Sequence, residues 1–153
     1  MVIVFVGVHY HFVSEENMQA AIRDEKFVEH ACVHTNYYGT SHDSIRVVQE
    51  SGVICILDID IQGVKNIKSS NLESKYIFVA PPSMASLENR LRDRKTETEE
   101  KIQIRLKNAS AELSYGHEAG NFDAVIINDD INRAFEEVVG KISSWYPSMH
   151  FDS

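Results

Sequence analysis

The sequence predicts an α/β protein built in three layers, with a mainly parallel sheet between helices. Apolar runs typical of strands alternate along the chain with segments whose apolar residues recur at helical spacing. One run, VICILDI at 53–59, is apolar almost throughout, as in a strand that is covered on both faces. The chain has 153 residues, 43% of them hydrophobic and 25% charged, which predicts a single domain over 1–153 with a substantial core.

The first half of the chain is predicted to contain three strands and two helices. The apolar runs that suggest strands lie at 1–6, 27–34 and 53–59. Ser14 is a candidate N-cap for the first helix, and the second begins near Ser41 and stops at Gly52. The residues expected to face inward from these helices are Met18, Ala21, Ile22, Ile45 and Val48.

The second half repeats the alternation. A strand is expected at 76–82, broken by Pro81 and Pro82, and the last strand is expected at 122–128. Three helices are predicted, with N-caps at Ser83, at Thr96 in a capping box with Glu99, and at Asp130. The residues predicted to line their inner faces are Met84, Leu87, Leu91, Ile102, Leu106, Ala109, Leu113, Ile131, Phe135, Val138 and Ile142.

Charge and cysteine content restrict the functional classes. Fifteen basic and twenty-three acidic residues give a net charge of −8, which argues against nucleic-acid binding by bulk charge but allows a small basic nucleotide pocket. Cys32 and Cys55 are expected to be reduced cysteines of an intracellular protein. The apolar start at 1–10 lacks a basic n-region and is too short for a membrane span, so no membrane association is expected.

Two acids follow the run at 53–59. In parallel sheets ligands bind at the carboxyl ends of the strands, where Asp58 and Asp60 are expected to lie. A carboxylate there suits a hydrated magnesium ion near phosphates. The alternative is that both acids simply cap the helix that follows.

Arginines are concentrated in RLRDRKTETEEKIQIRL, residues 90–106, although the chain is acidic overall. Arg90 and Arg94 are one helical turn apart, and a helix–turn–helix would bring Arg105 back toward Arg94. Converging guanidinium groups bind phosphate oxygens and stabilise charge during phosphoryl transfer. The alternative is a solvated helical hairpin with intrahelical salt bridges, which is the commoner use of a charge run.

The stretch FVEHACVHTNYYGT, residues 27–40, offers groups that could read a purine. The carboxylate of Glu29 could accept two hydrogen bonds from the adjacent N–H donors of guanine, and a tyrosine hydroxyl could donate to a phosphate. The alternative is that Tyr37 and Tyr38 are ordinary strand residues, one buried and one exposed.

The same stretch raises the question of zinc. His30, Cys32 and His34 alternate, so a strand would place them on one face, where His9 and His11 could complete a set of ligands. The spacing matches no closed zinc pattern. Ordinary strand histidines are therefore the favoured interpretation.

These pieces together resemble the guanylate kinase family. The matching stretches occur in the family's order, at 9–14, 27–41, 55–68, 80–83, 90–106 and 122–130. The resemblance implies a P-loop-kinase-like fold with a small β-rich GMP-binding subdomain at about 9–40 and a helical lid at about 90–106. It also implies a cytoplasmic, monomeric transferase of purine nucleotide metabolism that uses ATP and Mg²⁺ to convert GMP to GDP.

The resemblance also implies roles for individual residues. The residues that would bind GMP are Tyr10 and Tyr38 at its phosphate, Glu29 and Thr40 at guanine, and Asp60 as a further contact. The lid arginines that would reach over ATP and the transferring phosphoryl group are Arg90, Arg94 and Arg105. Asp58 would serve magnesium, through water, and Asn128 would contact adenine.

The start of the chain departs from the family's pattern. Members carry a phosphate loop of the form G-x-x-G-x-G-K-[ST], and only Gly7 could echo its first glycine here. Two arginines that would grip the GMP phosphate are also missing from the sequence. We therefore expect an N-terminally shortened chain that turns over poorly, and whose uncovered sheet face could favour self-association.

A second functional class remains open. Scaffold proteins carry guanylate-kinase-like modules that bind GMP or phosphopeptides without catalysis, and these also lack an intact phosphate loop. The present chain nevertheless keeps DIDIQG at 58–63 and the arginine segment with TETEE at 96–100. Because these features serve ATP and the transfer step, the sequence favours the enzyme.

Overall fold

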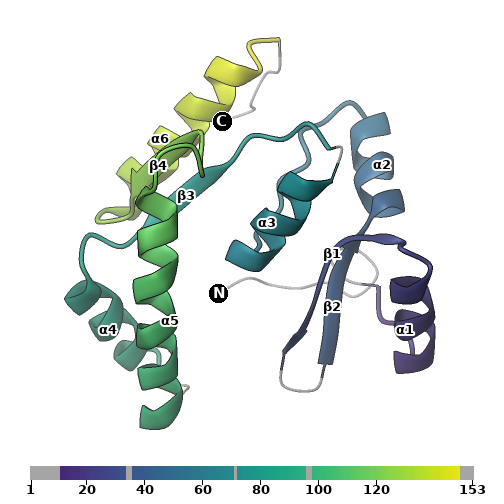
Figure 1. The fold of residues 1–153 in the computed structure, drawn as a ribbon. Coiled ribbons are helices and arrows are strands. Elements are labelled where there is room, and N and C mark those ends of the chain that lie inside the picture. The colour runs from purple at the N-terminus through teal and green to yellow at the C-terminus, as the bar shows by residue number, and fades with distance from the viewer. Residues whose placement is uncertain (1–10, 34–35, 71, 96–97, 149–153) are drawn as a thin grey trace. The chain divides into compact units, whose positions relative to one another are not determined.

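The computed structural model describes residues 11–33, 36–70, 72–95 and 98–148. The chain divides into two compact units, Met1–Leu72 and Glu73–Ser153. Figure 1 shows helices and strands in both units, so the α/β class predicted from the sequence is observed. The strand predicted at 1–6 lies outside the described residues, and the grouping of the whole chain into one domain stays a prediction.

The first unit is organised around an antiparallel hairpin. Strands β1 (Phe27–Val33) and β2 (Asn36–Ser41) pair with each other. Helices α1 (Glu15–Arg23) and α3 (Ile61–Ser69) contact β1, and α2 (His42–Glu50) contacts β2. The buried apolar residues of this unit come from both the hairpin and the helices and are Met18, Val28, Ile45, Val64 and Ile67.

A β-bulge near the start of β1 sets the register of the hairpin. Phe27 pairs with Ser41 and Glu29 pairs with Thr40, so two steps along β1 match one step along β2. Val28 is the extra residue, and it is buried. The bulge therefore places an apolar anchor in the core immediately before the residue that opposes Thr40.

The helix boundaries predicted for the first unit are confirmed. The Ser14 hydroxyl caps α1 by accepting from Asn17 N at 3.3 Å, and Ser41 caps α2 by accepting from Ser44 N at 3.1 Å. Gly52, just after α2, has a φ of 78°, a left-handed conformation that glycine adopts without strain.

The strand predicted at 53–59 is wrong. Residues 54–60 belong to neither a helix nor a strand, and no described strand pairs with them. Val53 is 56% exposed and Ile56 is 70% exposed, so the run is not covered on both faces. Apolar composition alone does not make a strand, because a strand requires a neighbour that accepts its backbone hydrogen bonds.

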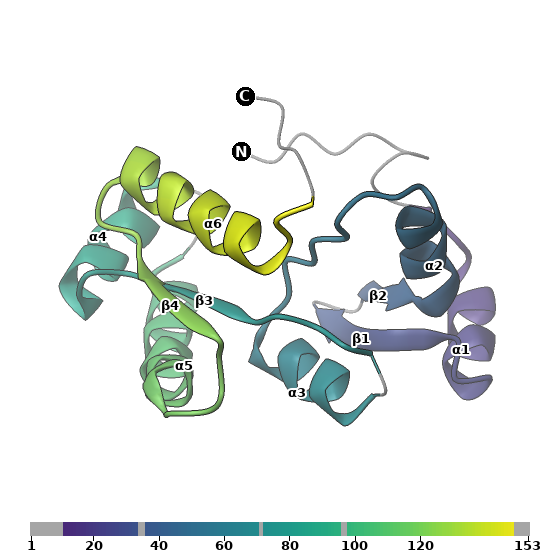
Figure 2. The same ribbon diagram turned by 90° about the horizontal axis from the view of Figure 1, so that it is seen from above.

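The second unit contains a parallel pair of strands between helices. Strand β3 (Ile77–Ala80) pairs in parallel with β4 (Ala124–Ile127), and Asn128 N extends the ladder by donating to Ala80 O at 2.8 Å. Helix α5 (Glu99–His117) contacts β3, and α6 (Ile131–Trp145) contacts β4. Figure 2 shows α5 and α6 on opposite sides of the two strands, with α4 (Met84–Asp93) beside α5.

Close packing joins α5 to β3. Gly116 is buried, and a Cβ atom built there would overlap three carbons of the Phe78 ring. The same ring packs against Phe122, with centroids 5.1 Å apart, and meets the edge of His117 at 6.0 Å. Only a residue without a side chain lets the helix backbone approach this aromatic cluster so closely.

The predicted helix caps of the second unit are confirmed at two of three places. Ser83 accepts from Ser86 N at 3.1 Å, and Asp130 accepts from Arg133 N at 2.9 Å. The capping box is wrong, because Thr98 is the N-cap of α5 and Glu99 is its first helical residue.

The inner face predicted for α6 is partly wrong. Ile131 is 69% exposed and Phe135 is 66% exposed, whereas Ala134 and Ile142 are buried. The buried stripe thus runs through Ala134 rather than through Ile131 and Phe135, on a helix that contacts β4. On α5 the prediction holds, since Ile102 is buried and Leu106, Ala109 and Leu113 are half-buried. Among the described residues no helix has the length and apolar character needed to cross a membrane.

Candidate functional site

The hairpin β1–β2 brings two predicted guanine-binding residues together. Glu29 and Thr40 are directly opposite each other in the ladder, and Thr40 Oγ1 donates a hydrogen bond to Glu29 Oε1 at 2.7 Å. Both side chains are half-buried. Because the hydroxyl has used its only hydrogen, its remaining capacity is to accept, as is that of the second carboxylate oxygen. The pair therefore offers acceptors to a ligand.

Tyr38 lies on the same face of the hairpin as this pair. It is two residues before Thr40 and pairs with Ala31, which is two residues after Glu29. Its side chain is 45% exposed. The neighbouring Tyr37 lies on the other face and is 37% exposed, so the alternative of one buried and one exposed tyrosine is wrong. Tyr10, the other predicted phosphate donor, lies outside the described residues.

The two acids of DIDIQG differ in what they contact. Asp60 is the N-cap of α3, and its Oδ1 accepts from Gly63 N at 2.8 Å. Asp58 is exposed and caps no described helix. Among the described helices the capping alternative therefore applies to Asp60 alone.

The zinc question concerns β1. His30 and Cys32 occupy alternate positions on the strand and are both exposed, while His9 and His34 lie outside the described residues. The part of the chain that is described contains no group of three metal-binding side chains. Neither cysteine takes part in a disulfide, and partial burial raises the pKa of the Cys55 thiol.

The predicted lid arginines lie on the α4–α5 hairpin. Arg90 is half-buried on α4 and its NH2 group donates to the carbonyl oxygen of Asp129 at 3.5 Å. Arg94 is the exposed C-cap of α4, and Arg105 is exposed on α5. The three predicted residues therefore lie on two helices that pack against each other.

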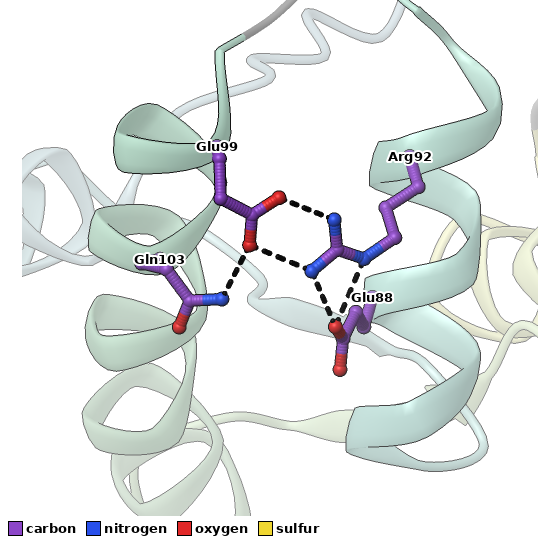
Figure 3. A network of polar contacts seen from close by, with 4 residues as sticks. All are labelled: Glu88, Arg92, Glu99 and Gln103. Atoms are coloured by element: carbon purple, nitrogen blue, oxygen red, sulfur yellow. Dashed lines mark hydrogen bonds and ion pairs between the residues drawn. The ribbon is translucent and has the colours of Figure 1, made fainter.

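A fourth arginine, to which the sequence assigned no role, lies where the end of α4 meets the start of α5. Figure 3 shows Arg92 of α4 reaching Glu88 on its own helix and Glu99 on α5. Its Nε and NH2 atoms donate to Glu88 Oε1 at 2.9 and 2.8 Å, and NH2 also donates to Glu99 Oε1 at 2.8 Å. Its NH1 atom donates to Glu99 Oε2. Glu99 Oε1 also accepts a hydrogen bond from Gln103 Nε2 at 2.8 Å.

Hydrogen bonds in and beside this network shift the pKa values of its charged groups. The hydrogen bonds from Arg92 and then Gln103 lower the pKa of Glu99 from 4.5 to about 2. The hydrogen bonds that Arg92 donates to Glu99 and then to Glu88 raise the pKa of Arg92 above its usual range. The pKa of Glu100 is lowered by a hydrogen bond from its own backbone N–H and then by the hydroxyl of Thr98. Arg92 and Glu99 are therefore both charged at neutral pH.

The alternative of intrahelical salt bridges is thus correct for Glu88 and Arg92. It did not include the ion pair between Arg92 and Glu99, which joins two helices. The spacing of Glu88 and Arg92 is the i,i+4 pattern that predicts an intrahelical pair. The pair of Arg92 and Glu99 joins residues seven apart on two helices, so helical spacing alone does not reveal it. The predicted capping box gave Glu99 a role within its own helix and therefore predicted no partner on α4.

The predicted adenine contact lies where β4 meets α6. Asn128 follows the strand directly and is half-buried. The next residue, Asp129, accepts from Asp130 N at 2.7 Å and forms an ion pair with Arg133, and these contacts lower the pKa of its carboxyl. The turn beside Asn128 is therefore held in a defined conformation.

Comparison with known proteins assigns the family. The family model described as guanylate kinase matches residues 5–144. The chain is 49% identical over 132 residues to Guanylate kinase 1 of Arabidopsis thaliana, covering 86% of this chain and 34% of that protein. It is 47% identical over 137 residues to guanylate kinase of Homo sapiens, covering 90% and 70% respectively.

A solved structure gives the same result. The crystal structure of guanylate kinase from Anaplasma phagocytophilum matches with a TM-score of 0.69 and 27% identity, over 92% of this chain and 67% of that chain. The present chain thus spans about a third of the length of the plant relative and 65% of guanylate kinase of Schizosaccharomyces pombe. On the extent of these matches, the chain belongs to the guanylate kinase family.

Proposed function

We propose that this protein transfers a phosphoryl group from ATP to GMP, giving ADP and GDP. Family membership supports this activity, because the relatives that match most of the chain bear the name guanylate kinase. The acceptor pair formed by Glu29 and Thr40 is the single structural observation that carries the proposal.

The pair suits guanine for a simple chemical reason. Guanine presents N1–H and an exocyclic amino group side by side, so two acceptors complement it. Adenine presents an unprotonated ring nitrogen at the corresponding position, which would face a carboxylate oxygen without a hydrogen between them. Glu29 would therefore accept from N1–H and the amino group, with Thr40 as a further acceptor.

The remaining predicted residues complete the proposed reaction. Tyr38 and Tyr10 would donate to the GMP phosphate, and Asp60 would support the same site. Arg90, Arg94 and Arg105 would stabilise the charge of the transferring phosphoryl group, and Asn128 would contact adenine. Asp58 would serve Mg²⁺ through water, which fits a lone exposed carboxylate, because magnesium retains several waters beside one or two acids and substrate phosphates.

The proposal extends to the architecture and the setting of the protein. We infer a three-layer, P-loop-kinase-like fold with a mainly parallel sheet, in which 9–40 form the GMP-binding part and 90–106 the lid. A monomer in the cytoplasm, acting on small nucleotides rather than nucleic acid or membranes, fits this role. The poor turnover expected of the 153-residue chain stays a prediction.

Titration calorimetry with GMP and AMP tests the proposal. GMP should bind, and Glu29→Gln should weaken it by about 100-fold, because hydrogen bonds to charged groups contribute about 1.5–3 kcal/mol each. Glu16→Gln, which removes one exposed carboxylate from α1, is the matched control and should leave GMP affinity unchanged.

Two results would overturn the assignment. One is equal affinity for GMP and AMP. The other is a GMP affinity that does not change in the Glu29→Gln variant. A coupled assay with ATP, GMP and Mg²⁺ then measures turnover separately. GMP binding without any turnover would instead favour a non-catalytic nucleotide-binding module.

A further inference from the structure

Arg92 uses its guanidinium group almost entirely on carboxylates. Arginine has five N–H donors, and the contacts to Glu88 and Glu99 occupy four of them (Figure 3). The side chain is 40% exposed, so it is placed at the surface of the hairpin rather than in its core. An arginine that is saturated in this way has little capacity left for a phosphate. Arg94, by contrast, forms no hydrogen bond or ion pair with a described residue.

The network joins the C-terminal end of α4 to the N-terminal end of α5. Arg92 is in the last turn of α4, and Glu99 is the first residue of α5. A cation at a helix C-terminus and an anion at a helix N-terminus are each favoured by the helix dipole. The bidentate pair therefore joins the two helices at the point where both local fields support it.

Apolar packing is a second restraint between the described residues of α4 and α5. The chain connects α4 to α5 through residues 94–98. Leu91 and Ile102 provide buried apolar side chains on the two helices, and packing of this kind resists separation more than sliding or twisting. A planar fork bound to two carboxylate oxygens fixes orientation as well as distance.

We propose that Arg92 is a positioning residue, which clamps α4 to α5 through Glu99 so that Arg90, Arg94 and Arg105 act as one rigid set. The inference rests on the proposed phosphoryl transfer for its consequence, but the clamp itself is a property of the hairpin. Glu88 orients the Arg92 side chain from its own helix, and Gln103 holds the shared oxygen of Glu99. Arg92 would touch neither nucleotide.

The expected size of the effect follows from the cost of misplacement. A displacement of about 1 Å in a catalytic group can lower a rate by about 100-fold. Loss of the clamp loosens the arginines without removing them. We therefore expect a loss of about 10-fold in kcat, well below the 10³–10⁵-fold contributed by a catalytic arginine.

Distance measurement between spin labels tests the clamp without any need for activity. Labels at Ala85 of α4 and Lys107 of α5, with Cys32 and Cys55 changed to Ser, should give a narrow distance distribution. Glu99→Ala should broaden it. Glu100→Ala should not, because Glu100 is in the same first turn of α5 but is hydrogen-bonded to its own backbone and to Thr98 rather than to α4. Equal broadening by both variants, or by neither, would overturn the clamp.

Kinetics then test the positioning role. In protein that converts GMP to GDP, Arg92→Ala and Glu99→Ala should each lower kcat about 10-fold, while the KM for GMP changes less than about twofold. The double variant should lose no more than either single variant, since all three remove one interaction. Arg92→Lys, which keeps the charge but not the fork, should recover only part of kcat.

The kinetic outcomes separate the two proposals. An unchanged kcat in Glu99→Ala, in an enzyme that is active before mutation, contradicts the positioning role and leaves the proposed function intact. Additive losses in the double variant would likewise contradict it. If the enzyme binds GMP but never phosphorylates it, the proposed function fails, and the spin-label distances still decide whether the clamp exists.

Discussion

The two hairpins of this protein use a carboxylate in opposite ways. In β1–β2, Thr40 contacts one oxygen of Glu29 and leaves the pair with unused acceptors on a half-buried face. In α4–α5, Arg92 bonds both oxygens of Glu99 and spends most of its own donors in doing so. The first arrangement is incomplete without a ligand, whereas the second is complete without one.

This difference shows how a binding residue can be distinguished from a structural one within a charged segment. The useful quantity is the hydrogen-bonding capacity that remains after the contacts inside the protein are counted. By that measure Glu29 and Arg94 are ready for a ligand, and Arg92 is not. Composition would have ranked Arg92 and Arg94 equally.

The largest expected effect tests whether the α4–α5 hairpin is held by the packing of α5 against β3 as well as by charge. Gly116→Ala should lower the free energy of unfolding by about 1–3 kcal/mol, because the added methyl group overlaps the Phe78 ring in a packed cluster. Urea unfolding measures the change. Gly140→Ala on α6 is the matched control, since a methyl group there meets no atom and should stabilise the helix by about 0.5–1 kcal/mol.

A second substitution keeps this test specific. Phe78→Leu combined with Gly116→Ala should recover part of the lost stability by making room for the methyl group. If Gly116→Ala were as stable as the native chain, the close approach of α5 to β3 would be refuted.

An intermediate effect sharpens the comparison at β1–β2. Thr40→Val keeps the shape of the side chain but removes the hydroxyl, so GMP affinity should fall about 10-fold, or about 1.4 kcal/mol. Calorimetry measures this directly. AMP affinity should not change, because the acceptors concerned select guanine. A GMP affinity equal to that of the unaltered protein would show that Thr40 merely buttresses the strand.

The smallest effect concerns the pH dependence of the clamp. The pKa of Glu99 is lowered from 4.5 to about 2 in the folded chain, so its contribution to stability is complete above pH 4.5 and is lost as pH falls toward 2. The difference in unfolding free energy between the unaltered chain and Glu99→Ala should therefore be the same at pH 7 and pH 5 and smaller at pH 3. Exposure of both side chains keeps this difference small. A gap that widened on acidification would contradict the sign.

Local signals in the sequence predicted most of the helices, and family resemblance predicted the acceptor pair. Ser14, Ser41, Ser83 and Asp130 were identified as N-caps because capping depends on a few adjacent residues. Glu29 and Thr40 were predicted by family resemblance as guanine readers, and the strand register brings them into contact.

What could not be predicted depends on partners distant in the chain. The run at 53–59 has strand composition, yet no described strand pairs with it. The inner face of α6 depends on which side of the helix packs against β4, which helical spacing alone cannot reveal. Arg92 was overlooked because its distinguishing contact, Glu99, lies on another helix.

The bulge at Val28 makes the hairpin unequally tolerant of changes in chain length. Because Val28 has no opposite residue, a deletion there would let Phe27 and Glu29 follow one another along Ser41 and Thr40, and the acid would keep its partner. A deletion between His30 and Val33 would instead shorten the stretch of chain that separates the acid from its partner. Insertions and deletions during the divergence of such chains should therefore accumulate before the acid rather than after it.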